Sequence, residues 1–180
     1  LRDKSGIELT GEAVGLYNMK SNVDLAVYSF GQNFSLTPLQ MITAVSAVAN
    51  GGTLLEPHII KEVLNADGTV LESHQRSEVR QVVSKETSDL MREMLESVVK
   101  VGTGKNAYLA GYRIGGKTGT AEKYPRGNGN YIVSLASFEP YDDPNLFIMV
   151  IIDEPHVEDQ SSGGYTTRLA NAIWRDVIEY

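Results

Sequence analysis

Residues 115–121 read Gly-Gly-Lys-Thr-Gly-Thr-Ala and lie inside the first of three segments with the composition of β-strands. These segments are residues 112–123, 131–138 and 146–152, and the two connections between them are short and rich in Pro, Gly, Asn and Asp. Short connections are typical of antiparallel hairpins, because parallel strands need a longer crossover. An antiparallel sheet is therefore predicted. Its last strand is apolar throughout, so we expect it to be covered on both faces.

Helices are predicted on both sides of this sheet in the sequence. Thr37 and Gln40 have the spacing of a capping box at the start of one helix. The helical segments are residues 22–30, 37–50, 84–100 and 167–179, and a further strand is predicted over residues 58–64. With 180 residues, of which 42% are hydrophobic, the chain is long enough for one sizeable core. The predicted fold class is α+β, an antiparallel sheet flanked by helices.

The side chains of the first strand are suited to binding an anion. Residues two apart on a strand point to the same side, so the hydroxyls of Thr118 and Thr120 are expected to face together. Gly119 would let a ligand lie close to the backbone, and the ammonium of Lys117 adds positive potential. We interpret the strand as a carboxylate-binding edge whose backbone N–H groups can hold an oxyanion.

A phosphate-binding loop is the competing interpretation of the same residues. Residues 111–118 match the bare pattern Gly-x-x-x-x-Gly-Lys-Thr. That motif requires a buried strand before it and a helix directly after it. The residues after Thr118 have no helical periodicity, and Gly119 and Pro125 lie among them. Phosphate binding is therefore the weaker interpretation.

Composition argues against several classes of protein. The formal charge is −7, with 23 acidic and 16 basic residues and no basic stripe, so nucleic-acid binding is not expected. The chain contains no cysteine, which excludes disulfides, thiolate metal sites and a cysteine nucleophile. His58, His74 and His156 lack the spacing of a ligand pair, so neither a metal nor a cofactor is predicted. No run of about 18 apolar residues indicates a membrane span.

Lys-Thr-Gly is one of three signatures of penicillin-binding proteins and related β-lactamases. Residues 116–123, Gly-Lys-Thr-Gly-Thr-Ala-Glu-Lys, resemble the third motif of class B penicillin-binding proteins. Other segments resemble that family in the same order, namely residues 29–32, 36–40, 49–53, 102–104 and 151–155. The resemblance covers nearly the whole chain.

This resemblance implies a serine-type peptidoglycan D,D-transpeptidase. In such an enzyme a serine attacks the D-Ala-D-Ala end of a stem peptide, forms an acyl-enzyme and passes the acyl group to an amine. β-Lactams acylate the same serine. By the resemblance, Lys117 supplies charge and assists proton movement, and Thr118 and Thr120 hold the carboxylate of the substrate or antibiotic beside Gly119. The Thr120 N–H would be half of the oxyanion hole. Other cell-wall synthesis proteins are further implied partners, and the implied location is the outer face of the bacterial membrane.

The first two motifs of the family do not occur as expected. No Ser-x-Asn is present, and the one Ser-x-x-Lys is residues 97–100. Ser97 is expected near a helix C-terminus, whereas a nucleophile gains from a helix N-terminus. We therefore expect residues 1–180 to be the C-terminal portion of a single domain with the penicillin-binding transpeptidase or serine β-lactamase-like fold. Its N-terminal half would be a required partner, so the chain alone is expected to be inactive. The strand at 146–152 would keep one unpaired edge.

Three alternative functions stay open at this point. The chain could belong to a non-catalytic β-lactam sensor, to a scaffold subunit of the cell-wall machinery, or to a serine β-lactamase. An intact Lys-Thr-Gly-Thr sequence argues against a degenerate scaffold, which has no chemical need for it. A sensor would form a stable adduct without transferring it, and a β-lactamase would turn the antibiotic over rapidly.

Overall fold

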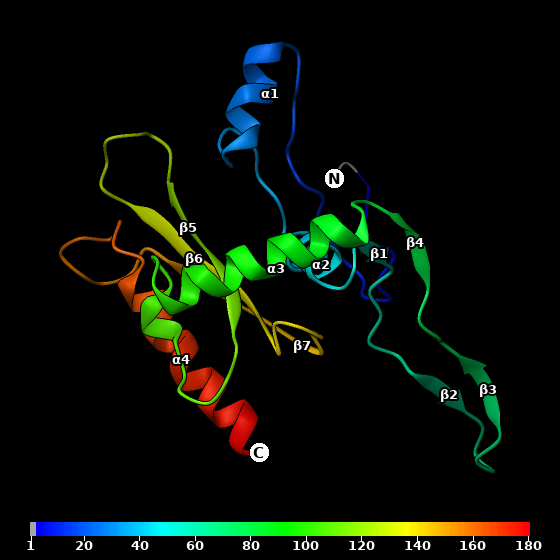
Figure 1. Cartoon of the computed structure of the whole chain (residues 1–180). Helices are drawn as coiled ribbons and strands as arrows, with labels where there is room; N and C mark the ends of the chain where they lie inside the picture. Colours follow the sequence, from blue (N-terminus) through cyan, green and yellow to red (C-terminus); the bar gives the residue numbers. More distant parts are fainter. Residues whose placement is uncertain (1–2) are drawn as a thin grey trace. The chain divides into compact units, whose positions relative to one another are not determined.

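The computed structural model describes residues 3–180, which form two compact units (Figure 1). One unit contains the described residues up to Ala47 and Thr53–Val82, and the other contains Val48–Gly52 and Val83–Tyr180. All of the paired strands in the described residues are antiparallel. The predicted α+β class is therefore confirmed.

The helices of the first unit are α1 (Asn22–Ser29) and most of α2 (Pro38–Ala49). The capping box predicted from the sequence is present. The Gln40 N–H donates to Thr37 Oγ1 over 3.1 Å, and the Thr37 N–H donates to Gln40 Oε1 over 3.2 Å. These two bonds satisfy N–H groups that the first turn of a helix leaves without an intrahelical partner.

The strands of the first unit form two small sheets, β1 (Thr53–Leu55) with β4 (Glu78–Gln81) and β2 (Glu62–Leu64) with β3 (Val70–Ser73). The predicted strand at 58–64 is shorter than expected and begins at Glu62. The turn between β2 and β3 has Gly68 at φ 86°, a conformation that glycine adopts without a steric penalty. The other short strands were missed because three or four residues, none of them buried, carry no readable alternation.

The second unit contains the predicted sheet, in the order β5 (Gly115–Glu122), β6 (Tyr131–Glu139) and β7 (Leu146–Asp153). Its helices are α3 (Lys85–Lys100), the 3₁₀ turn η1 (Lys105–Ala107) and α4 (Gly164–Glu179). The strand boundaries agree with those predicted to within three residues, and α4 begins three residues earlier than predicted.

Two helices pack on the sheet and fix its position in the core. Leu95 of α3 packs on Phe138, and the buried Trp174 of α4 donates its indole N–H to Ser137 Oγ over 3.0 Å. Neighbouring residues of a strand face opposite ways, so these contacts lie on opposite faces of β6. The sheet therefore has an apolar cluster on each face.

The expectation that the last strand is covered on both faces holds only in part for the described residues. Ile148 packs on one apolar cluster and Phe147 on the other, while other residues of the strand are exposed. Only Val150 of β7 is buried, while Leu146 is 42% and Ile151 is 38% exposed. The strand is at the end of the sheet in residues 3–180, so one edge has no neighbour, as expected. An apolar run predicts a buried strand only where both neighbours and both covering layers are present.

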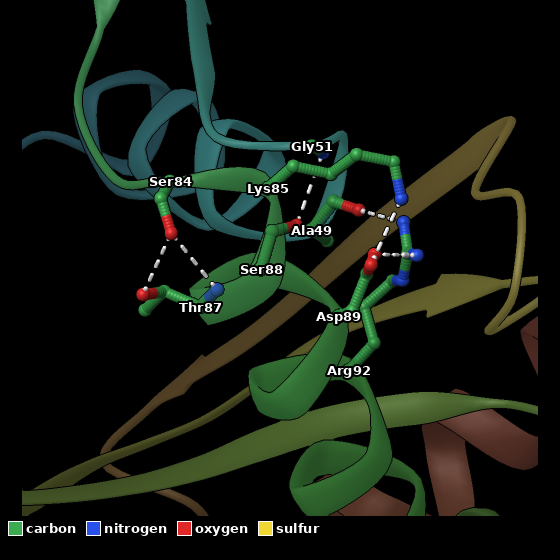
Figure 2. A network of polar contacts seen from close by, with 8 residues as sticks. All are labelled: Ala49, Gly51, Ser84, Lys85, Thr87, Ser88, Asp89 and Arg92. Carbon is green, nitrogen blue, oxygen red and sulfur yellow. Dashed lines mark hydrogen bonds and ion pairs between the residues drawn. The ribbon is translucent and has the colours of Figure 1, made fainter.

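A polar network ties the turn after α2 to the start of α3 (Figure 2). The buried Ser88 accepts the Gly51 N–H over 3.0 Å, and Arg92 donates to the Ala49 carbonyl over 3.0 Å. The Asp89 carboxylate accepts a hydrogen bond from Arg92 and a second one from Lys85, the latter over 2.8 Å. These bonds give the carbonyl and N–H groups of the turn partners within the same unit.

Ser137→Ala is expected to destabilise the second unit by about 1–3 kcal/mol, because the buried Trp174 indole N–H then loses its acceptor. Calorimetry of the complete protein should show a lower melting temperature for the transition that involves this unit. Ser134→Ala, in the same strand but only partly buried, is the matched control and should have a smaller effect. Equal melting temperatures for Ser137→Ala and the unmodified protein would contradict the prediction.

Candidate active site

The Lys-Thr-Gly-Thr segment forms the middle of β5, at one edge of the three-stranded sheet. It pairs with β6 in an unbroken antiparallel register. Side chains alternate along a strand, so Thr118 and Thr120 share one face and Lys117 and Gly119 the other. The common orientation of the two threonines agrees with the prediction. A strand at this place is incompatible with the phosphate loop, whose helix would begin here.

The free edge of β5 presents the backbone groups of Thr118 and Thr120. Just beyond the strand, the Lys123 N–H donates to the Asn130 carbonyl over 2.9 Å. Bonded and non-bonded pairs alternate in an antiparallel ladder, so odd-numbered residues of β5 bond to β6 and even-numbered residues point their N–H and C=O away from it. No strand pairs with this edge in residues 3–180. The Thr120 N–H is therefore directed out of the sheet, as an oxyanion donor must be.

The ammonium of Lys117 lies at the same edge. The Lys117 side chain is exposed and donates a hydrogen bond to the carbonyl oxygen of Thr118, one of the groups directed away from β6. A lysine ammonium has three donors, so it can contact this carbonyl and a ligand at once. The positive charge that the sequence predicted for the anion site is therefore present along the edge.

Each threonine hydroxyl has a contact from a different segment. Thr118 Oγ1 lies 2.9 Å from Thr103 Oγ1, which follows α3, and Thr120 Oγ1 donates to the carbonyl of Ser161, in the loop before α4, over 3.5 Å. The second distance is at the outer limit of a hydrogen bond, so that contact is weak. Sequence reasoning assigned no role to Thr103 and did not single out Ser161, because nothing local to either residue indicates its distant partner.

The packing of the sheet favours glycine at position 119 for a reason that does not involve a ligand. A methyl group at this position would come within 2.6 Å of Ser134 Oγ on the neighbouring strand. Gly115 is even more constrained, because a methyl group there would lie 2.4 Å from the ring of the buried Phe138. Glycine at position 119 therefore has two explanations, the close approach of a ligand expected from the sequence and the close cross-strand approach to Ser134.

Gly119→Ala is expected to slow acylation by a penicillin no more than a few-fold, because the new methyl group meets only Ser134 Oγ, which can rotate away, while Ser134 Cβ lies at an ordinary 4.0 Å. The double variant Gly119→Ala with Ser134→Gly removes the clash and should recover most of the rate. The measurement is the rate of labelling of the complete protein by a fluorescent penicillin. A double variant no faster than Gly119→Ala would show that the clash is not the cause.

The C-terminal end of β5 is fastened to the end of β7. Lys123 lies 2.6 Å from a carboxylate oxygen of Glu154 and 2.9 Å from one of Asp153. Hydrogen bonds to Glu154 and then to Asp153 raise the pKa of Lys123 above its ordinary value. The loop that contains Ser161 is also bound to the start of β6, since the Tyr131 N–H donates to Gln160 Oε1 over 2.9 Å. The loop is therefore held to the end of β5 by Lys123 and to the start of β6 by Tyr131.

Ser97 lies in the last turn of α3, as predicted. Its carbonyl accepts from the N–H groups of Val101 and Gly102, so the helix ends directly beyond it. The partial charge at this end of a helix is negative, which disfavours the alkoxide that a nucleophilic serine must approach. This placement agrees with the expectation that Ser97 lies near a helix C-terminus. That Ser97 is not the nucleophile remains a prediction.

Two of the histidines meet in the first unit, which their sequence spacing did not indicate. The ring centroids of His58 and His74 are 6.2 Å apart, and His74 lies 3.4 Å from Glu8 and 3.3 Å from Glu72. Glu72 lies in β3 and His74 directly follows that strand, whereas Glu8 and His58 come from two other segments outside the strands. No group of three or more metal-binding side chains with a suitable arrangement occurs in residues 3–180.

The fold and the edge strand that carries Lys-Thr-Gly-Thr agree with the resemblance to penicillin-binding proteins that the sequence suggested. Residues 2–177 match the family described as the penicillin binding protein transpeptidase domain. The chain belongs to this family of penicillin-binding transpeptidases of peptidoglycan synthesis.

Curated relatives support the same assignment. Stage V sporulation protein D of Bacillus subtilis is 42% identical over 97% of this chain and 28% of its own length. Penicillin-binding protein PbpB of Mycolicibacterium smegmatis is 35% identical over 96% of this chain and 29% of its own length. The chain thus spans less than a third of these relatives.

Solved structures of the family superpose well on this chain. Penicillin binding protein 3 of Mycobacterium tuberculosis has a TM-score of 0.88 and 31% identity, covering 99% of this chain and 44% of that one. The same protein has been solved in complex with ampicillin and with aztreonam. The transpeptidase domain of penicillin-binding protein 3 from Burkholderia pseudomallei has a TM-score of 0.84 and 30% identity over 99% of this chain. The predicted family and fold are confirmed. Across residues 3–180 no helix is both long and apolar enough to cross a membrane.

Proposed function

We propose that residues 1–180 are the C-terminal portion of a single transpeptidase domain of a peptidoglycan D,D-transpeptidase that β-lactams inhibit. The observation that carries the proposal is the free edge of β5. It combines the outward N–H of Thr120 with the ammonium of Lys117 and the hydroxyls of Thr118 and Thr120. An acyl-transfer site needs this combination, because it must hold a carboxylate and stabilise an oxyanion together.

The nucleophilic serine comes from the N-terminal half of the same domain in this proposal. The serine oxygen attacks the carbonyl of the penultimate D-Ala, its proton passes with the assistance of Lys117 to the leaving amine, and the terminal D-Ala departs. An acceptor amine then attacks the ester, gives up a proton and releases the serine hydroxyl. During both steps the Thr120 N–H stabilises the negative oxygen. The hydroxyls of Thr118 and Thr120 beside Gly119 hold the substrate carboxylate, and Thr120 gives up its weak contact with the Ser161 carbonyl to do so.

The proposed partners follow from this chemistry. They are peptidoglycan stem peptides, β-lactam antibiotics, the N-terminal half of the domain and other cell-wall synthesis proteins. Binding of β-lactams is supported by the ampicillin and aztreonam complexes of the Mycobacterium tuberculosis structure. The proposed location is the extracytoplasmic face of the bacterial membrane, where the peptidoglycan substrate lies.

The test is labelling with a fluorescent penicillin, followed by intact mass and peptide mapping. The complete protein should take up one covalent label on a serine outside residues 1–180, and the 180-residue chain alone should remain unlabelled. A label on Ser97 or on another serine of this chain would refute the proposal that the nucleophile lies elsewhere. A label that is lost rapidly would indicate a β-lactamase. A stable label without transfer of a stem-peptide analogue to an amine would indicate a sensor.

A further inference from the structure

The hydroxyl of Thr118 has a defined neighbour outside the Lys-Thr-Gly-Thr segment. Thr118 Oγ1 and Thr103 Oγ1 are 2.9 Å apart, a good distance for an O–H···O hydrogen bond, and either oxygen can be the donor. Thr103 is exposed and Thr118 is partly buried, so the pair lies at the surface beside the free edge of β5. The contact joins two segments that are 15 residues apart in the sequence.

The turn that carries Thr103 is tightly fixed. The Gly102 and Gly104 N–H groups both donate to the carbonyl of Val98, over 3.1 and 3.0 Å. A methyl group at Gly102 would lie 2.9 Å from that carbonyl oxygen, and one at Gly104 would lie 3.1 Å from it. The two glycines therefore let the chain fold closely against the last turn of α3. Thr103, between them, is held in one place relative to the helix.

The chemistry of a hydroxyl gives this contact a direction. A threonine hydroxyl has one hydrogen to donate and two lone pairs to accept with. A carboxylate is only an acceptor, so Thr118 can bind it only by donating its single hydrogen. Its contact with Thr103 must then use a lone pair of Thr118, with Thr103 as the donor.

From this geometry we propose that Thr103 is a positioning residue of the active site. By donating to Thr118, it orients the Thr118 hydrogen away from α3 and toward the carboxylate of the substrate or antibiotic. This inference rests on the proposed transpeptidase function. Thr103 itself does not touch the reacting atoms. Its effect is to preorganise a donor, which reduces the orientational freedom that ligand binding would otherwise remove.

The closing experiment measures the acylation rate of the complete protein, with the variants Thr103→Val and Thr103→Ser. Valine has the shape of threonine without the hydroxyl, and serine keeps the hydroxyl. Benzylpenicillin and its methyl ester are compared, since the ester lacks the anionic acceptor. We expect Thr103→Val to lower the second-order rate with benzylpenicillin roughly three- to tenfold, the range for one hydrogen bond. Thr103→Ser should restore most of the rate, and the ester should react equally with all three proteins.

The outcomes separate positioning from a structural role. An unchanged rate for Thr103→Val, an equal loss with the acid and the ester, or a failure of Thr103→Ser to restore the rate would each overturn the inference. The double variant Thr103→Val with Thr118→Val should be no slower than Thr118→Val alone, because Thr103 acts through Thr118. A complete unmodified protein that does not react with benzylpenicillin would refute the proposed function itself, which is a distinguishable result.

Discussion

Lys117→Ala is expected to slow acylation of the complete protein by benzylpenicillin by at least about a hundredfold, the size typical of losing a positioned acid–base group. The ammonium lies on the free edge of β5, in contact with the Thr118 carbonyl and beside the groups that would hold an anion. Its loss removes both positive potential and a proton-transfer group from that edge. The rate of labelling by a fluorescent penicillin is the measurement.

Two further variants separate the causes of this loss. Lys117→Arg keeps the charge but cannot release a proton at neutral pH. If Lys117→Arg is acylated nearly as fast as the unmodified protein, the role of Lys117 is electrostatic. If Lys117→Arg is as slow as Lys117→Ala, the role of Lys117 is proton transfer. Lys105→Ala, which removes an exposed lysine from η1, is the matched control and should leave the rate unchanged. Normal labelling of Lys117→Ala would remove Lys117 from the site.

The elements that sequence reasoning placed correctly have strong local signals. The capping box at Thr37 and Gln40 predicted the start of α2, and three strand-like segments joined by short turns predicted β5, β6 and β7. Each of these features depends on residues close together in the sequence. The orientation of Thr118 and Thr120 also followed, because alternation on a strand is a local property.

The parts that sequence reasoning missed depend on distant partners. The contact of Thr118 with Thr103 and the close approach of Gly119 to Ser134 join segments that are 15 residues apart. The coverage of β7 was overestimated, because the apolar character of Ile151 does not reveal whether another layer is packed on it. Burial and cross-strand contact are properties of the assembled fold, and a local pattern predicts them only indirectly.

Thr120→Pro is expected to slow acylation about 10²–10³-fold more than Thr120→Val does, the usual effect of losing one oxyanion-hole donor. Valine removes the hydroxyl and keeps the N–H, whereas proline also removes the N–H. Because even-numbered residues of β5 point their N–H away from β6, proline at position 120 removes no ladder hydrogen bond. Proline is accepted at such positions of an edge strand.

The neighbouring residue provides the control for this reasoning. Ala121 is odd-numbered, so its N–H is directed at β6, opposite Ile132. Ala121→Pro should therefore lower the stability by about 1 kcal/mol or more, the net value of a ladder hydrogen bond, while Thr120→Pro should melt close to Thr120→Val. If Thr120→Pro instead melted as low as Ala121→Pro, the assigned hydrogen-bond phase of β5 would be wrong. If Thr120→Pro melted normally and was acylated as fast as Thr120→Val, its N–H would have no part in holding the oxyanion, and the free edge of β5 would bind ligands through side chains alone.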